Sequence, residues 1–285
     1  MFDYDQLSQP MSRCGQVGPV GQTDFLMSNG ADAGGGAGDR PVPRYNLPMN
    51  FSRRRVLKYA LGLMLVGGIV VLAVAGWFYS QREMRRMRGI GPFVNEPETH
   101  PDWIVEGGSR CGTAPMIIPS TGYIGVGYRD GTPPMYAHTG YDIFSPAGAD
   151  NVTPIYAAYD GYLTREANWR SAVIIRHPEF PELVDGEQIW TYYTHMASRD
   201  GEISYIDPAF PQGTYELFVE QGTLLGYQGT WSGDPARYMT LHLHFSIVKS
   251  TGPDTYANET KSQNTYDPLP FLGLVEREDG VIVCA

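Results

Sequence analysis

The chain has 285 residues, of which 42% are hydrophobic, and its formal net charge is −10. This length and composition allow one or two domains with a buried core. Residues 91–285 hold 25 Asp and Glu residues but only 10 Lys and Arg residues. This part of the chain is therefore a poor candidate for binding nucleic acid, which requires cations against phosphates. The three cysteines include no CxxC pair, which argues against a thiolate zinc site.

Residues 1–52 show neither a helical nor a strand period, and they contain a glycine-rich run at 30–38. Such a composition is typical of flexible, disordered segments. We therefore expect a disordered N-terminal tail without a catalytic role. Docking of this tail to a cytoplasmic partner stays an open alternative.

Residues 59–80 form an uncharged run that is rich in Leu, Val, Ala and Gly. A bilayer core requires about 20 helical residues, so this run predicts a single transmembrane helix. Basic residues lie on both sides of the run, which disfavours the alternative of a buried helix in a soluble core. With these flanks the predicted membrane segment is 53–88. It contains no GxxxG motif, so the sequence implies no dimerisation and leaves the oligomeric state open.

Residues 89–111 contain Gly, Pro and acidic residues without a clear period, and we expect a linker with a solvated His100. From 112 to 285, short segments rich in Tyr, Ile, Val and Thr alternate with Gly, Pro and Asp turns. This pattern predicts a mainly β domain, antiparallel in character. Its candidate strands are Pro154–Tyr159, Gly161–Glu166, Ala172–His177, Gln188–Met196, Thr223–Tyr227 and Leu241–Val248. The long connection Arg199–Leu217 is expected to form a wall or lid of a site.

The segment Thr240–Val248 alternates apolar and polar residues, which predicts a half-buried strand. His242 and His244 then point to the same face, opposite Leu243 and Phe245. A single histidine is usually structural, but two buried imidazoles on one face need polar partners and are more typical of a functional site.

Further candidate site residues occur in Tyr136–Phe144, where His138 and Asp142 are four positions apart. With a histidine from the paired strand they make a three-ligand set, and three protein ligands with an open fourth position are typical of catalytic zinc. Two histidines and a carboxylate also describe a non-haem Fe(II) oxygenase site. That alternative is disfavoured, because such a site does not need further histidines, whereas the candidate strand Gln188–Met196 adds His195.

Taken together, these segments resemble the M23 zinc metallopeptidases, the lysostaphin-like peptidoglycan endopeptidases. Three motifs carry the resemblance, which extends over roughly residues 117–275: His138-Thr-Gly-Tyr-Asp142, Tyr193-Thr-His195 and His242-Leu-His244. The resemblance implies a twisted antiparallel sheet with a groove walled by loops. It implies one Zn²⁺ bound by His138, Asp142 and His244, and it implies that His195 and His242 are catalytic histidines that do not bind the metal. His177 is expected to be structural.

The resemblance also implies the substrate and its location, which are peptide bonds of peptidoglycan outside the membrane. Because some members of the family have lost activity, a wall-binding scaffold or activator of the same fold is the alternative function. The sequence departs from the family pattern at Thr240 and Leu241, where the family usually has Gly and a small residue or Pro. It also departs at Trp231, where a Gly is expected, and at Ser246, where the family usually has Glu. We expect these differences to affect substrate preference more than catalysis.

Basic residues near the helix, five before it and four after it, orient it only weakly. The expected orientation therefore comes from the wall substrate, which requires the N-terminus in the cytoplasm and residues 81–285 outside. An oxidising exterior would favour a disulfide between Cys111 and Cys284. Two free thiols are the alternative, because the sequence gives no distance between them.

Overall fold

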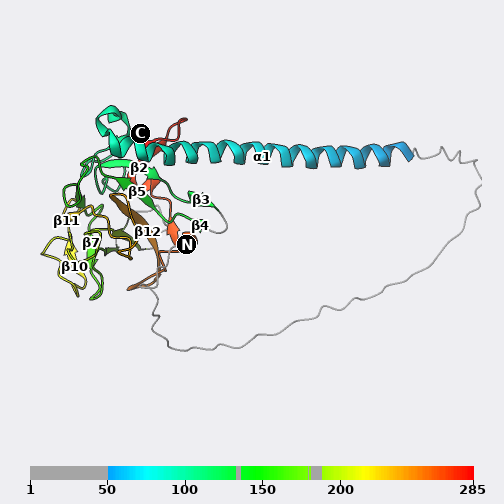
Figure 1. Cartoon of the computed structure of the whole chain (residues 1–285). Coiled ribbons are helices and arrows are strands. Elements are labelled where there is room, and N and C mark those ends of the chain that lie inside the picture. The colour runs from blue at the N-terminus through cyan, green and yellow to red at the C-terminus, as the bar shows by residue number, and fades with distance from the viewer. Residues whose placement is uncertain (1–50, 133–135, 179, 181–187) are drawn as a thin grey trace, which may run out of the picture. The chain divides into compact units, whose positions relative to one another are not determined.

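The computed structural model describes residues 51–132, 136–178, 180 and 188–285 (Figure 1). The predicted disordered tail therefore lies outside the described residues, apart from residues 51 and 52. The described residues fall into two compact units, 51–74 and 75–285.

The first unit is entirely helical and belongs to α1, Phe51–Asn95. Among the described residues, this is the one helix long and apolar enough to cross a membrane, and its most apolar window is fully exposed within the structure. Exposed Leu, Val and Ile side chains all along a helix have no place in a soluble core, whereas lipid would cover them. The prediction of one long apolar helix is confirmed, and its insertion in a membrane stays a proposal.

The predicted linker is wrong in its first seven residues, because α1 continues through Pro92 to Asn95. Ile90, Phe93 and Val94 form a second apolar cluster with Tyr123 and Phe144 of the sheet. This packing stabilises helical turns whose Gly and Pro content suggested a break. Later in the predicted linker, His100 is only half exposed and stacks on the indole of Trp103, with 3.9 Å between ring centroids.

An antiparallel sheet dominates the second unit, as predicted. Its strands lie in the order β1-β2-β5-β12-β9-β8-β7-β10, and β13 and β14 pair with the long β12. Figure 1 labels β2, β5, β12, β7 and β10 of this sheet. The bounds along this order are Ile104–Val105, Gly122–Val126, Tyr141–Phe144, His242–Gly252, Ile189–Thr194, Val173–His177, Gly161–Thr164 and Leu217–Val219, with β13 at Thr255–Tyr256 and β14 at Thr265–Tyr266.

Three two-stranded pairs and a few short helices complete the unit. The pairs are β11 (Leu224–Tyr227) with β6 (Pro154–Tyr156), β15 (Leu274–Glu276) with β16 (Ile282–Cys284), and β3 (Gly131–Thr132) with β4 (Tyr136–Ala137). The short helices are α2 (Leu269–Leu272), η1 (Pro97–Thr99), η2 (Pro101–Trp103) and η3 (Ser262–Asn264).

All six candidate strands are present, most of them a few residues shorter than predicted, while β12 extends four residues further to Gly252. Strands β1, β2 and β10 of the large sheet were not among the candidates. β1 and β10 have only two and three residues, and the two glycines of β2 lower its apparent strand propensity. The main core contains the inward side chains of β5, β8, β9 and β12, among them the fully buried Leu243, Phe245 and Tyr193. The opposite face of β12 is also buried, so this strand is enclosed on both sides.

Cys111 and Cys284 form a disulfide that closes a loop of 173 residues. The bond joins the segment that follows β1 to β16 and so ties together the two ends of the β domain. This confirms the predicted pairing and excludes two free thiols in the folded chain.

Candidate metal centre

The three predicted site segments meet because β5, β12 and β9 are neighbours in the sheet. In the register of β12 with β5, His244 lies opposite Asp142. In the register of β12 with β9, His244 lies opposite Thr194, the residue before His195. The side chains of three separate motifs are thereby brought to one edge of the strands.

Gly140 explains how His138 reaches the same place from a loop. A Cβ atom at residue 140 would lie 2.1 Å from the carbonyl oxygen of Phe245, a distance that no side chain tolerates. Only glycine lets the backbone pass this close to β12. The chain can then turn tightly between His138 and Asp142, which places both side chains over His244.

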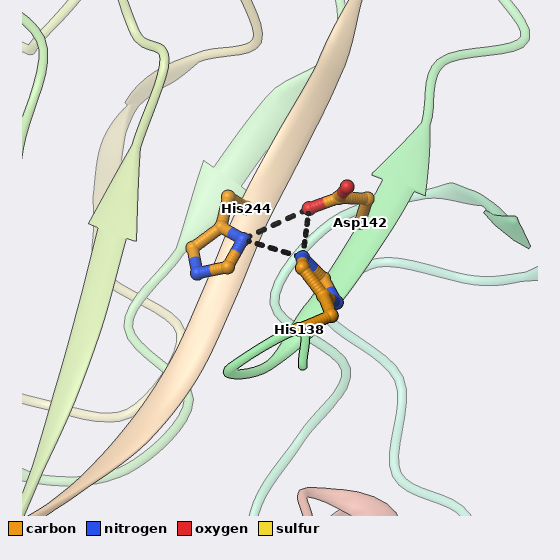
Figure 2. Close-up of side chains that lie close together, drawn as sticks. All are labelled: His138, Asp142 and His244. Carbon is orange, nitrogen blue, oxygen red and sulfur yellow. Dashed lines mark hydrogen bonds and ion pairs between the residues drawn. The ribbon is translucent and has the colours of Figure 1, made fainter. Parts of the chain in front are cut away.

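Figure 2 shows these three side chains pointing toward one another. Asp142 Oδ1 lies 3.0 Å from His138 Nε2 and 2.9 Å from His244 Nδ1, and the two nitrogens are 3.1 Å apart. The atoms that these three residues could offer to a metal ion, one from each residue, all lie within 4.8 Å of one another. A tetrahedral zinc site with bonds of about 2.0 Å has ligand atoms about 3.3 Å apart, so small side-chain shifts would accommodate the ion.

Hydrogen bonds on the far side of each imidazole determine which nitrogen is available. His138 Nδ1 lies 3.0 Å from the carbonyl oxygen of Gly127, which can only accept, so Nδ1 carries the proton. His244 Nε2 lies 2.9 Å from the carboxylate of Glu259, so there Nε2 is the donor. The nitrogens left for the cluster each present a lone pair to the other and to Asp142. Three converging lone pairs repel one another unless a cation lies between them, and this donor set fits Zn²⁺.

The pKa values of the ligand set describe the same preference for positive charge. Burial alone would raise the pKa of Asp142, but His138 and His242 hold it well below its usual value. Burial would lower the pKa of His244, but hydrogen bonds to Asp142 and Glu259 outweigh this and raise it to about 10. Without a metal, a proton on His244 therefore supplies the positive charge that the cluster needs.

His195 and His242 lie beside the cluster of His138, Asp142 and His244 without belonging to it. The ring of His242 is 4.6 Å from that of His195, and His242 Nε2 is 3.6 Å from Asp142 Oδ1. Each donates its Nδ1 proton to a backbone carbonyl, His195 to Trp231 at 2.8 Å and His242 to Thr240 at 2.7 Å. In the neutral rings both Nε2 atoms are consequently proton acceptors.

Burial lowers the pKa of both of these rings. For His195, the neighbouring His242 and His244 lower the pKa further. His195 also has a backbone φ of 76°, a conformation that non-glycine residues rarely adopt and that concentrates at functional sites. Its ring lies beside the cluster, with 4.6 Å between the ring centroids of His195 and His242 and 6.1 Å between those of His195 and His244.

Glu259 is a site residue that the sequence analysis missed. Its buried carboxylate accepts hydrogen bonds from His244 Nε2 and from Thr139 Oγ1 at 2.7 Å, and Ser246 Oγ lies 3.3 Å away. The expected Glu at 246 is absent, and a carboxylate from the connection after β13 lies beside that position instead. Glu259 lies in no recognisable motif. The only signal in the sequence is that Ser246 stands where a Glu is expected, so that another acidic residue could take its place.

An open groove of about 740 Å³ gives access to the cluster. Besides the five histidine and aspartate side chains, it is lined by Tyr136, Thr139, Phe144, Tyr238, Met239, Thr240, Glu259 and Thr260. A neighbouring hollow shares Tyr238 and reaches Arg199 at the start of the long connection that we expected to form a wall. No residue of the connection Arg199–Leu217, which the structure describes in full, lines the groove itself, so the expected wall is not formed by this connection. Segments 238–240 and 259–260 line the groove instead.

The structure brings all five predicted site residues together, namely His138, Asp142, His195, His242 and His244. His177 lies elsewhere and is fully buried, with its ring nitrogens bonded to Asp160 O at 2.7 Å and Thr191 Oγ1 at 2.8 Å. Both of its nitrogens have protein partners in the core, which agrees with the structural role expected for it.

No family model and no curated protein sequence matches this chain. Similar solved structures include lysostaphin from Staphylococcus simulans, an antimicrobial peptidase, with 22% identity and a TM-score of 0.33 over 56% of this chain and 54% of lysostaphin. They also include the catalytic domain of the prophage-encoded M23 protein EnpA from Enterococcus faecalis, with 20% identity and a TM-score of 0.29 over 54% and 95% of the two chains. A third is the SpoIIQ–SpoIIIAH pore-forming complex, with 16% identity and a TM-score of 0.33 over 56% and 92%.

The chain therefore spans about half the length of lysostaphin. Lysostaphin and the M23 protein EnpA carry the names of the lysostaphin-like M23 family that the sequence motifs resemble. At such low identities and TM-scores the similarity carries no argument about chemistry, which rests on the side-chain geometry of the site.

Proposed function

We propose that this chain is a zinc-dependent endopeptidase that hydrolyses peptide bonds in the stem peptides or cross-bridges of peptidoglycan. The observation that carries the proposal is the arrangement of five side chains in one groove. Three of them converge through lone pairs on one point, and two neutral histidines with free Nε2 atoms lie beside it. An oxygenase site requires the first three only, whereas peptide hydrolysis uses all five.

His138, Asp142 and His244 would hold the ion through Nε2, a carboxylate oxygen and Nδ1. When bound there, zinc would polarise the scissile carbonyl and lower the pKa of a water molecule. Gly127 O and Glu259 hold the outer nitrogens of the two ligand rings and so fix their orientation.

His242 would act as the general base. Its Nδ1 proton is committed to Thr240 O, and its lowered pKa keeps Nε2 free to accept a proton from the attacking water at neutral pH. His195 would stabilise the developing oxyanion or pass a proton to the leaving amine. Because Trp231 O already binds its Nδ1 proton, His195 could donate from Nε2 only after that nitrogen had taken up the proton that the attacking water loses, directly or by way of His242.

The same proposal includes the location of the domain. Residues 59–80 of α1 would cross the cell membrane once, with the tail 1–52 in the cytoplasm and residues 81–285 on the outside, where peptidoglycan lies. The disulfide between Cys111 and Cys284 suits an extracytoplasmic, oxidising environment.

The proposal is tested by incubating the full chain, purified in detergent with one equivalent of Zn²⁺, with purified peptidoglycan. New amino termini should appear with time, and His242→Ala should release them at least 100-fold more slowly. His100→Ala, which changes a histidine outside the groove, serves as the matched control and should be as active as wild type.

Two other results would favour the alternative functions. If the zinc-loaded chain binds peptidoglycan without releasing amino termini, it is a wall-binding scaffold. If it retains iron rather than zinc and consumes oxygen, the site belongs to an oxygenase, and the peptidase proposal is wrong.

A further inference from the structure

The last turns of α1 are part of the β domain rather than a connection to it. Phe93 is fully buried, and it packs with Ile90 against Tyr123 and Phe144. The hydroxyl of Tyr123 donates to the backbone carbonyl of Arg86 at 2.7 Å. Apolar packing on one side of the helix and a backbone contact from the sheet fix this segment in place.

Arg86 lies at the centre of this contact, with a relative side-chain exposure of 3%. Its guanidinium group binds both carboxylate oxygens of Asp130, each at 2.6 Å from Nη2. Its Nη1 atom donates to Glu276 at 2.8 Å and to the carbonyl oxygen of Gly280 at 3.0 Å. A buried charge is retained only when such partners replace water, and here the fork geometry of arginine meets them all.

Asp130 is fully buried and connects this ion pair to the turn that follows β2. Its Oδ2 atom accepts the backbone N–H of Gly127 at 2.5 Å. A second contact comes from the same helix, because Glu83 accepts the N–H of Gly131 at 2.5 Å. Arg86, through Asp130, and Glu83 directly thus bind the turn 127–131 to α1.

The same turn positions His138. Gly127 O accepts the Nδ1 proton of the His138 ring at 3.0 Å. The backbone of His138 pairs with the turn on both sides, donating to Asp130 O at 2.9 Å and accepting from Arg129 N at 2.8 Å. An unbroken series of hydrogen bonds therefore runs from Arg86 through Asp130 and Gly127 to the ring of His138.

We propose that Arg86, at the end of the apolar helix, is a positioning residue for the metal ligand His138, so that the helical segment 83–95 completes the metal centre. This inference rests on the proposed function, because it presupposes that the site binds zinc. It deepens that function, since a β domain separated from α1 would leave Asp130 buried without its counter-charge and the Gly127 turn without support.

The test measures zinc affinity of the full chain in detergent by competition with a chromophoric chelator. Arg86→Met should raise the dissociation constant about tenfold, in the range measured when groups that orient metal ligands are removed. Arg85→Met changes an exposed arginine on the same helix and should leave the constant unchanged. Asp130→Ala should weaken zinc binding more than Asp130→Asn, whose amide oxygen can still accept the N–H of Gly127.

One further readout and one further variant separate a purely structural role from positioning. The visible spectrum of cobalt(II) bound in place of zinc reports ligand geometry, and it should change in Arg86→Met but not in Arg85→Met. If Arg86→Met does not fold, Arg86→Lys is used instead. It keeps the positive charge beside Asp130 but lacks the planar guanidinium group, and it should lose less zinc affinity than Arg86→Met is expected to lose.

The inference is overturned if the folded Arg86 variant has wild-type zinc affinity and a wild-type cobalt spectrum, whatever its thermal stability. If the wild-type chain itself binds no zinc, the proposed function fails instead, and the two failures are distinguishable.

Discussion

Four histidines in the groove are chemically distinguished by what lies behind each ring. Backbone carbonyls behind His138, His195 and His242 bind their Nδ1 protons, whereas the Glu259 carboxylate binds the Nε2 proton of His244. The first three therefore present Nε2 and the fourth presents Nδ1. Only two of these four atoms lie beside Asp142 Oδ1 within 3.0 Å, and this separates the proposed ligands from the proposed catalytic histidines.

Replacement of the proposed catalytic histidines should lower turnover and leave zinc binding intact. His195→Ala and His242→Ala are each expected to keep stoichiometric zinc and to lower kcat by about 10² to 10⁴, with little change in KM, because both rings act in the transition state. Metal analysis and steady-state kinetics on a defined wall peptide check this. Normal turnover in either variant would remove that histidine from the mechanism.

His177 predicts a pH dependence of stability that is independent of the metal centre. Burial lowers its pKa to about 4, from 6.5 in the unfolded chain. Between these values the unfolded chain binds a proton that the native chain does not, so stability falls as the pH falls through this window. The effect should reach about 3 kcal/mol near pH 4 and should fade out as the pH rises past 6.5, to almost nothing by about pH 7.5.

Urea unfolding of wild type and His177→Gln between pH 7 and pH 4, with a chelator present, measures this contribution. The wild-type unfolding free energy should fall more steeply with decreasing pH than that of the variant. Parallel curves would show that His177 does not remain neutral in the native chain.

At the scale of residues, the five central side chains were predicted because they lie in three short motifs, and their division into ligands and catalytic histidines came from the resemblance of those motifs to a known family. The alternation of β12 and the spacing of His138 and Asp142 contain that information locally. Glu259 could not be predicted in this way, since its partners Thr139 and His244 are distant in sequence and meet it only through tertiary packing.

At the scale of elements, the connection after β13 matters because it delivers Glu259 to the back of His244. Glu259→Ala should weaken zinc binding by about 10- to 100-fold, because the ligand ring loses the acceptor that fixes its orientation. Glu259→Gln retains an acceptor oxygen and should have a smaller effect. Calorimetric titration with zinc checks both variants against Glu278→Gln, a control at an exposed position. Equal affinities in all of them would assign Glu259 to folding only.

Strands were easier to predict than the end of the helix. The interior strands have β-branched and aromatic runs that are bounded by turn residues, so local sequence identifies them. Residues 89–95 contain Gly89, Gly91 and Pro92, which locally favour a break, and their helical state comes from Phe93 and Ile90 packing on the sheet. The apolar spacing of these two residues with Val94 was a helical signal that the breakers concealed.

For the whole molecule, the proposed orientation in a membrane follows from the proposed wall substrate rather than from charge. Of the four arginines after the apolar run, Arg86 is buried in an ion pair with Asp130 and not exposed at the surface. Protease added to cells with a permeabilised outer layer should therefore degrade residues 81–285 and spare a tag at the N-terminus. Cleavage of the tag with survival of the β domain would mean the reverse orientation, and the proposed wall substrate would then be out of reach.

The central claim is that one zinc ion is held by His138, Asp142 and His244. Its most direct test is the metal content of the full chain, purified in detergent without added metal and measured by mass spectrometry. We predict one zinc per chain in wild type and in His177→Gln, and none in His244→Ala. Retention of stoichiometric zinc by the His244 variant, or iron in place of zinc in wild type, would contradict the account.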